Sequence, residues 1–242
     1  MLLIDFLKRA IRKYFFNPKW RCVNCGKEIF DQGYFCAECK NQLPVNDGAY
    51  CEHCGRELLT AQNYCSTCRE NLVSLDKCRS AFSYKKPIST MIKRFKYGGK
   101  LYLADTFNDY LSSLYFKNYF NSDLIVYVPM TEKAEKKRGY NQSKILAEKL
   151  SSTVGVKVID AVVKIKQTDR QAKLNRKQRM QNLANAFRVV KKSEIKDKSV
   201  LIVDDVTTTG ATAEALALKL KNAGAKTVNL ISVASVPPSE KY

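Results

Sequence analysis

The chain has 242 residues, 45% of them hydrophobic, which is enough for one medium-sized domain with a buried core plus a small module. Lys and Arg total 42 against 23 Asp and Glu, so the formal net charge is +19; a surface this basic is typical of proteins that meet polyanions, although solubility alone also favours it. No run of 18 apolar residues occurs, which excludes a transmembrane helix from the prediction.

The first segment, residues 1–20, is amphipathic. Apolar side chains line one helical face of "MLLIDFLKRAIRKYFF", and Lys and Arg line the other. We expect this face to pack against the rest of the protein, with peripheral contact to anionic lipid as the rarer alternative. The segment is charged throughout and has no small-residue cleavage site, so we expect no signal peptide and a cytoplasmic protein.

Residues 21–78 contain an internal repeat. "CVNCGKEIFDQGYFCAEC" and "CEHCGRELLTAQNYCSTC" both read C-x₂-C-x₁₀-C-x₂-C, and a glycine follows the second cysteine in each. Each C-x₂-C turn presents two thiolates to one tetrahedral ion, and the glycine permits the tight turn, so we predict a double zinc ribbon with about two structural Zn²⁺ ions. The predicted ligands are Cys22, Cys25, Cys36, Cys39, Cys51, Cys54, Cys65 and Cys68.

The spacing leaves the pairing open, because each repeat could close its own site or the four pairs could interleave. A disulfide scaffold would need an oxidising compartment, for which the sequence offers no sign. His53, the only histidine, is expected to be a bystander, and the ninth cysteine, Cys78, a small buried residue. Four cysteines per ion leave no open position, so we expect structural or docking roles for both sites.

Residues 79–242 form a second domain in our interpretation. An extended piece at 81–84 precedes a helix near Pro87, whose apolar residues would share one face, and Gly98-Gly99 ends that helix before another at 101–119. A buried strand follows at 124–128. The residues expected on the shared face of the first helix are Ile88, Met91, Ile92 and Phe95.

After that strand we expect a charged loop and then a helix with Asn141 as its cap. The loop would carry Lys133, Lys136, Lys137 and Arg138 to the edge of the sheet. Further on, strands at 161–165 and 186–190 would flank a basic stretch, 167–185. Residues 161–200 hold twelve Lys or Arg against three acidic residues. Such a charge favours binding of pyrophosphate or of a nucleic-acid backbone. The alternative is an exposed hairpin whose charges only keep it solvated.

The most informative stretch is "VLIVDDVTTTGATAEALALKLKNAGAKTV". It predicts a buried strand at 200–203, a loop, a helix at 212–222 and a strand at 227–236. Ligands of open α/β sheets sit where strands end and helices begin, because N–H groups there favour anions. No G-x-x-x-x-G-K-[ST] or G-x-G-x-x-G motif occurs. We expect sugar hydroxyls or hydrated Mg²⁺ at Asp204 and Asp205, and phosphate at Val206, Thr207, Thr208, Thr209, Gly210, Ala211 and Thr212.

This segment resembles the phosphoribosyl pyrophosphate loop of type I phosphoribosyltransferases. "MIKRFKYGG", "YVPM" with "KKRGYNQSK", "RQAKLNRKQRMQNLANAFRV" and "LIVDDVTTTGAT" stand in the order found in the ComF competence family, and the similarity covers Cys22 to about Val236. It implies a parallel α/β sheet with helices on both faces, phosphoribosyl pyrophosphate with Mg²⁺ as ligand, and handling of incoming single-stranded DNA in natural transformation.

The same resemblance implies roles for three cations. The loop around Arg138 resembles the pyrophosphate-binding loop, and 167–185 resembles a flexible hood in which Arg170 or Lys173 would capture pyrophosphate. Two functions remain open. One is a DNA-uptake factor that docks other competence proteins through its zinc module. The other is a working phosphoribosyltransferase, a glycosyltransferase with an amide, ammonia or nucleobase acceptor. A zinc-ribbon transcription factor would leave 200–212 unexplained.

Overall fold

The computed structural model describes residues 20–30, 33–55, 58, 63–69, 74–165 and 183–237. The chain divides into two compact units, Met1–Leu43 and Pro44–Tyr242. The first cysteine repeat belongs to the first unit, and the second repeat belongs to the unit that holds the sheet. The predicted amphipathic segment lies outside the described residues, apart from its last residue. Within the described ranges no helix has the length and apolar character needed to cross a membrane.

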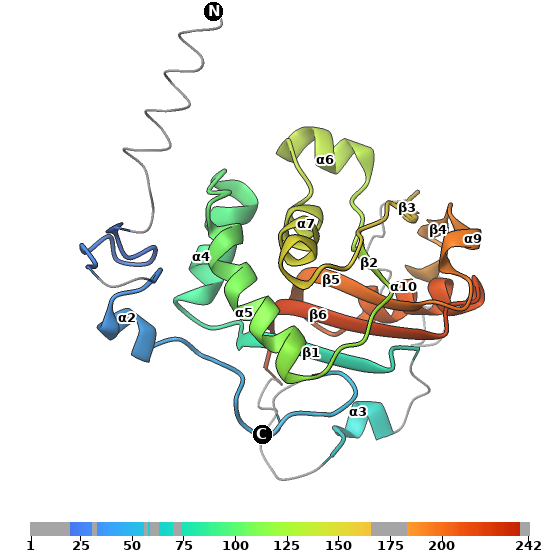
Figure 1. The fold of residues 1–242 in the computed structure, drawn as a ribbon, viewed down its shortest axis with the longest axis horizontal. Coiled ribbons are helices and arrows are strands. Elements are labelled where there is room, and N and C mark those ends of the chain that lie inside the picture. Colours follow the sequence, from blue (N-terminus) through green and yellow to red (C-terminus); the bar gives the residue numbers. More distant parts are fainter. Residues whose placement is uncertain are drawn as a thin grey trace, which may run out of the picture. The chain divides into compact units, whose positions relative to one another are not determined.

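The second unit is built on a four-stranded parallel sheet, as the sequence predicts. Its strands, in the order β1-β6-β5-β2, are β1 (Lys77–Ser83), β6 (Thr227–Ser235), β5 (Ser199–Thr207) and β2 (Leu124–Tyr127). All neighbours pair in parallel, for example Val203 with Ile231. The central strands are apolar on both faces because helices cover both sides of the sheet (Figure 1).

The helices that cover one face are α4 (Ile88–Tyr97), α5 (Leu103–Lys117) and α7 (Gln142–Val154), and α10 (Ala211–Asn222) covers the other (Figure 1). The predicted apolar stripe of α4 is confirmed, because Ile88, Met91, Ile92 and Phe95 are fully buried. Asn141 caps α7 as predicted: its Oδ1 accepts from the backbone N–H groups of Ser143 and Lys144.

The strands predicted around the basic stretch are present as a hairpin. β3 (Val162–Lys164) pairs antiparallel with β4 (Phe187–Val189), and the short helix α9 (Lys192–Ile195) follows. Most of the predicted hood lies outside the described residues, including Arg170 and Lys173.

Two differences from the prediction concern the edge of the sheet where the ligand is expected. The charged loop after β2 is a helix, α6 (Glu132–Arg138): Thr131 caps its start, and Gly139, with φ of 86°, ends it. None of its residues is buried, but its caps stabilise it, and so do the acidic residues in its first turn and the basic residues in its last turn. Second, β5 continues past Val203 to Thr207 because β6 extends alongside it, pairing Thr207 with Ser235. The turn between β5 and α10 is therefore short.

Candidate functional site

Each cysteine repeat closes its own cluster. The four Sγ atoms of Cys22, Cys25, Cys36 and Cys39 lie within 4.8 Å of one another, and so do those of Cys51, Cys54, Cys65 and Cys68. Two of the Sγ–Sγ separations, Cys25 to Cys36 at 3.7 Å and Cys54 to Cys65 at 3.8 Å, match the edge of about 3.8 Å of a tetrahedron with Zn–S bonds of ~2.3 Å. Both clusters fit a structural zinc ion, and interleaved pairing is excluded.

The two clusters share one backbone design. In the first, Gly26 has φ of 77° and donates to the carbonyl oxygen of Cys22; in the second, Gly55 has φ of 66° and donates to that of Cys51. Left-handed glycine turns the chain so that both thiols of the C-x₂-C pair point the same way. Short helices, α2 (Ala37–Asn41) and α3 (Ser66–Arg69), carry the last cysteine of each set.

The residues outside the clusters behave as expected. His53 is not part of the second cluster, and its Nε2 lies 4.0 Å from Oε1 of Glu214 on α10. Cys78 is 1% exposed, within β1. The unit of Pro44–Tyr242 thus contains the second ribbon together with the sheet.

A second cluster of polar groups forms at the carboxyl end of β5. Asp205 is 3% exposed, and its Oδ2 lies 2.8 Å from Nζ of Lys96 at the end of α4. Oδ1 of Asp204 accepts hydrogen bonds from the Ser143 hydroxyl and from the Asp205 backbone N–H, both at 2.9 Å. The sheet therefore brings together two carboxylates, the start of α7 and the end of α4.

The charge of Asp204 is disfavoured where it lies. Burial, and next the Asp205 carboxylate, raise its pKa to about 7, against the opposing effect of the Asp205 N–H, Ser143 and Lys96. Burial lowers the pKa of the neighbouring cation Lys164 on β3, and the charge of Asp204 opposes this shift. A ligand that brings hydroxyl donors or a cation to Asp204 would relieve this cost.

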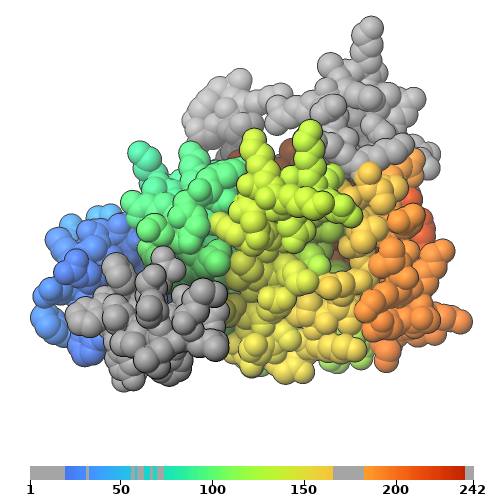
Figure 2. Space-filling model, turned by 90° about the horizontal axis from the view of Figure 1, so that it is seen from above, coloured from blue at the N-terminus to red at the C-terminus, as the bar shows by residue number. Residues whose placement is uncertain are grey.

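Arg138, predicted to bind pyrophosphate, lies at the end of α6. Its guanidinium stacks on Tyr97, 5.0 Å from the ring centre, and donates to Gln142 Oε1. Because Tyr97 follows Lys96, one turn of α4 contacts both Arg138 and Asp205. In Figure 2 the residues of α6 form a yellow-green ridge beside the green surface of α4 and the turn after it.

The predicted phosphate loop spans the end of β5 and the start of α10. Val206 and Thr207 lie in β5, where the Thr207 hydroxyl donates to Ser232 Oγ at 2.9 Å. Thr208 and Thr209 are exposed, and Gly210, with φ of 76°, is the N-cap of α10. Ala211 and Thr212 form the first turn of that helix. Exposed hydroxyls and N–H groups at a helix start can hold an anion.

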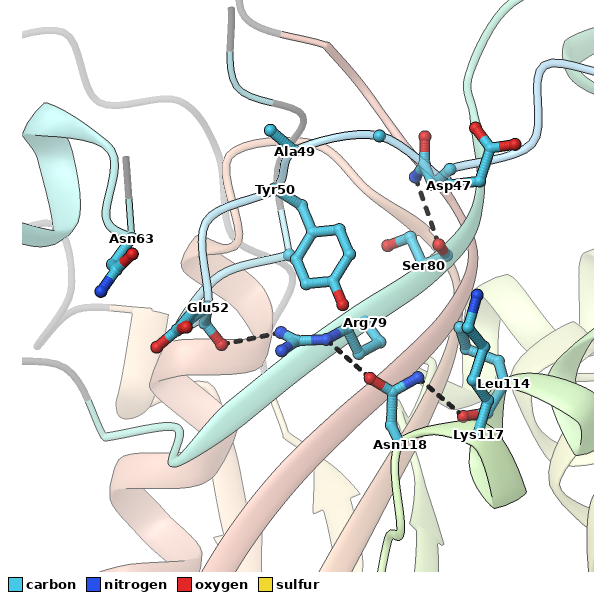
Figure 3. Close-up of a pocket in the computed structure, with 13 residues that line it drawn as sticks. Asp47, Ala49, Tyr50, Glu52, Asn63, Arg79, Ser80, Leu114, Lys117 and Asn118 are labelled. Atoms are coloured by element: carbon cyan, nitrogen blue, oxygen red, sulfur yellow. Dashed lines mark hydrogen bonds between the residues drawn. The ribbon is translucent and has the colours of Figure 1, made fainter. Parts of the chain in front are cut away.

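A pocket of about 440 Å³ lies elsewhere, between the second ribbon and the sheet (Figure 3). Its central feature is Arg79, 7% exposed, which stacks on Tyr50 at 4.3 Å. Nη1 donates to the carbonyl oxygens of Glu52 and Cys78, and Nε donates to Asn118 Oδ1. These bonds join the ribbon, β1 and α5, so we interpret the contacts around Arg79 as a structural joint.

Sequence reasoning missed Lys96, Tyr97, Ser143 and Lys164 as site residues. "MIKRFKYGG" predicts a helix that ends at Gly98-Gly99 and carries a family resemblance, but neither assigns a role to Lys96 or Tyr97. The signal for both is their place just before the Gly98-Gly99 break, where a helix end can reach the sheet edge. Ser143 follows the Asn141 cap and faces β5 for the same topological reason.

Two family models match the chain: the double zinc ribbon domain over residues 13–69 and the phosphoribosyl transferase domain over residues 136–241. Among solved structures, a purine phosphoribosyltransferase from Pyrococcus horikoshii is 21% identical with a TM-score of 0.32, covering 57% of this chain and 89% of that one. Glutamine phosphoribosylpyrophosphate amidotransferase from B. subtilis is 19% identical with a TM-score of 0.39, covering 53% and 25%.

Similar sequences include Competence protein F of Haemophilus influenzae, 32% identical over 228 residues, which cover 91% of this chain and 98% of that protein. DNA utilization protein YhgH of Escherichia coli K12 is 31% identical over 61% of this chain and 66% of its own. Competence protein ComFC of Streptococcus pneumoniae is 29% identical over 64% and 66%. The chain therefore belongs to the ComF family of competence proteins, with a double zinc ribbon ahead of a phosphoribosyl transferase domain.

Proposed function

We propose that this protein binds phosphoribosyl pyrophosphate, or a related ribose phosphate, at the carboxyl end of β5 and handles single-stranded DNA in the cytoplasm during natural transformation. The ligand is inferred mainly from the polar groups that lie together at the carboxyl end of β5. Two carboxylates, Asp204 and Asp205, stand beside a turn of exposed hydroxyls. Lys96 pairs with Asp205, Lys164 interacts with the charge of Asp204, and Arg138 stacks on Tyr97, the residue after Lys96. Vicinal ribose hydroxyls suit the carboxylates, and a phosphate suits the turn.

Magnesium enters this proposal with the ligand. Asp205 is paired with Lys96, and one oxygen of Asp204 is used by Ser143, so the carboxylates alone do not form a cage for the ion. Mg²⁺ usually keeps waters and substrate phosphate oxygens among its six ligands. In our proposal the ligand's own oxygens hold most of the ion, Asp204 supplies at most one contact, and Lys96 neutralises Asp205.

Calorimetry with phosphoribosyl pyrophosphate, with and without Mg²⁺, tests the site. Asp204→Asn with Asp205→Asn should weaken binding by ~1.5–3 kcal/mol for each charged hydrogen bond lost. Asp197→Asn is the matched control, because Asp197 is exposed at the opposite end of β5 and asparagine tolerates its φ of 60°. Equal affinity for the double variant and the control would remove the ligand from the site.

The DNA part of the proposal is supported by the names of the relatives and by charge. Of the three relatives described above, one is named a DNA utilization protein and two are named competence proteins. Besides the net charge of +19, α6 ends in Lys136, Lys137 and Arg138, next to the site. Contacts of this kind would be to phosphates, so binding should show little sequence preference.

Fluorescence anisotropy with a labelled single strand, measured over a range of salt, tests this part. Affinity should fall as salt rises, with a slope of ~0.7 per phosphate contact. Charge reversal of Arg176, Lys177 and Arg179, in the predicted hood, should flatten the slope, whereas the aspartate variants should leave it unchanged. Undetectable binding at physiological salt would exclude DNA as a partner.

A working phosphoribosyltransferase is the second candidate, favoured by the match of residues 136–241 to the phosphoribosyl transferase domain. Leaving-group charge would be stabilised by Mg²⁺, Arg138 and, in the hood, Arg170 and Lys173. A screen for pyrophosphate release with amide, ammonia and nucleobase acceptors decides between the two. Release that requires one acceptor and is lost in Arg138→Met would establish the transferase.

We also propose that the first ribbon docks other competence proteins. Trp20 is 63% exposed and Phe30 is 87% exposed on that unit, and large exposed aromatic residues are common at protein interfaces. Loss of a competence-protein partner in a pull-down with Trp20→Ala and Phe30→Ala, with zinc content unchanged, is the expected result.

A further inference from the structure

The second zinc turn, residues 51–55, is fixed to β1 by a close backbone approach. A Cβ on Gly55 would lie 2.5 Å from the carbonyl oxygen of Cys78. Arg79 holds the same turn from the side, because its Nη1 donates to the Glu52 carbonyl oxygen at 2.7 Å (Figure 3). The turn that carries two of the four zinc ligands therefore cannot shift without moving β1 or breaking these contacts.

The same turn reaches the predicted phosphate loop. Cys54 lines a crevice with the end of β5, the turn after it and the end of β6; its other lining residues are Thr207, Thr208, Thr209, Gly210, Ser235 and Val236. The crevice has a volume of about 10 Å³, room for a single water molecule at most. A zinc ligand and the phosphate loop are thus neighbours across almost no free space.

The chain that leaves the second ribbon holds the other side of the loop. Glu214, in the first turn of α10, accepts hydrogen bonds from the backbone N–H groups of Ser74 at 2.7 Å and Leu75 at 3.4 Å. His53, within the zinc turn, lies 4.0 Å from the same carboxylate. The helix that starts at the loop is therefore in contact with the ribbon both within its first cysteine turn and after its last cysteine.

From these contacts we infer that the second zinc centre positions the phosphate loop, so that zinc at Cys51, Cys54, Cys65 and Cys68 and a phosphate ester at Thr207–Gly210 strengthen each other's binding. The ligand in this inference is that of the proposed function, on which it rests. The first zinc centre belongs to the other unit and is not coupled to the loop. Such coupling is reciprocal: if zinc raises the affinity for the ligand, the ligand raises the affinity for zinc by the same factor.

The direction in which the ligand changes the zinc affinity distinguishes positioning of the loop from a simple effect of charge. Four thiolates and one Zn²⁺ carry a net charge of −2, whereas four thiols without metal are neutral. Charge alone would therefore make an anionic ligand loosen the zinc. Positioning does the opposite, because an ordered loop binds the ligand without first paying the entropy of ordering.

The experiment uses the full chain and a chromophoric chelator that reports released zinc. In Cys25→Ser with Cys39→Ser, only the second site holds metal. At equilibrium with the chelator, saturating phosphoribosyl pyrophosphate should raise the zinc affinity of this variant at least about fivefold, the lower end of typical coupling. In Glu214→Gln, which retains all eight cysteines, zinc content should stay at two while this gain in second-site affinity falls. Unchanged or lower zinc affinity with bound ligand would overturn the inference.

A ligand-free measurement distinguishes this inference from the proposed function. Hydrogen exchange of the peptide covering Thr207–Glu214 should quicken at least about fivefold when the chelator removes zinc from the second site, and should be unchanged when only the first-site ligands are replaced. If the native protein fails to bind the ligand, the proposed function fails and the exchange result still decides the coupling. An exchange rate that is independent of second-site zinc would contradict the coupling, whether or not the protein binds the ligand.

Discussion

The two zinc ribbons have the same cysteine spacing and the same left-handed glycine turn, but their surroundings differ. In the part of the chain that the structure describes, no residue beyond the chain neighbours of Gly26, the glycine of the first ribbon, comes within 4 Å of where its Cβ would lie, whereas Gly55, the glycine of the second, faces the backbone of β1. The first ribbon belongs to a unit ending at Leu43, and the second to the unit of the phosphoribosyl transferase domain. The cysteine spacing thus identifies the metal ligands, while the contacts of the glycine turn determine which part of the chain each metal site is packed against.

The largest effect should come from the buried first ligands, Cys51 and Cys22, which are 0% and 2% exposed. Either serine variant should lower zinc content from about two ions to about one. Cys51→Ser should destabilise Pro44–Tyr242 by more than ~5 kcal/mol, because metal-binding energy is folding energy, and lower its midpoint by about 10–20 °C. Circular dichroism should show no such loss for Cys22→Ser. Equal losses would mean that both ribbons support the sheet.

Next in size is the glycine pair. Gly26→Ala should cost ~1–2 kcal/mol, the strain of alanine in the left-handed region. Gly55→Ala carries the same strain plus overlap with the Cys78 carbonyl oxygen, ~1–3 kcal/mol more. Gly26→Asn should be close to neutral and Gly55→Asn should not. Chemical denaturation combined with zinc titration measures both series, and comparable costs at the two positions would contradict the asymmetry.

Arg79 tests the joint itself. Arg79→Met removes the donor to Glu52, Cys78 and Asn118 while keeping an apolar stem. It should cost ~3 kcal/mol, since a buried acceptor left without its partner, here the Cys78 carbonyl oxygen, costs about 1–3 kcal/mol and the other two acceptors are partly buried. Arg94→Met, on the exposed side of α4, is the control. If urea unfolding gives both variants a free energy of unfolding within ~0.5 kcal/mol of that of the native protein, the Arg79 contacts do not hold the second ribbon to the sheet.

The smallest effect belongs to the first ribbon. Lys27 pairs with Glu38 at 2.8 Å, but both side chains are well exposed, at 66% and 64%. Water screens such a pair, so Glu38→Gln should leave zinc affinity and the unfolding midpoint unchanged within error. A clear loss of zinc affinity in a competition assay would show that this ribbon, too, depends on contacts beyond its cysteines.

Local sequence signals predicted much of this structure. The cysteine spacing identifies both clusters, the apolar run at 200–203 identifies a central strand, and the stripe of α4 and the Asn141 cap are as expected. Helix α6 was missed because it buries no side chain, so hydrophobic periodicity carries no signal there, although Thr131 and Gly139 mark its ends.

What the sequence could not indicate are contacts made across the fold. Lys96 meets Asp205, and Gly55 meets Cys78, only because the strand order places α4 and the second ribbon against the sheet. The extra length of β5 likewise depends on β6 as a partner rather than on its own residues. Such contacts have no local pattern, and they determine which ribbon is joined to the site.

The close approach at Gly55 also constrains how the two repeats can diverge. At position 26 only the backbone angle selects the residue, so asparagine or aspartate can replace glycine over time without loss of the fold. At position 55 the missing side chain is itself the requirement, and no other amino acid meets it. The two copies should therefore diverge at different rates: the first ribbon can change its sequence or acquire a new recognition surface, while the second stays constrained by its contact with β1.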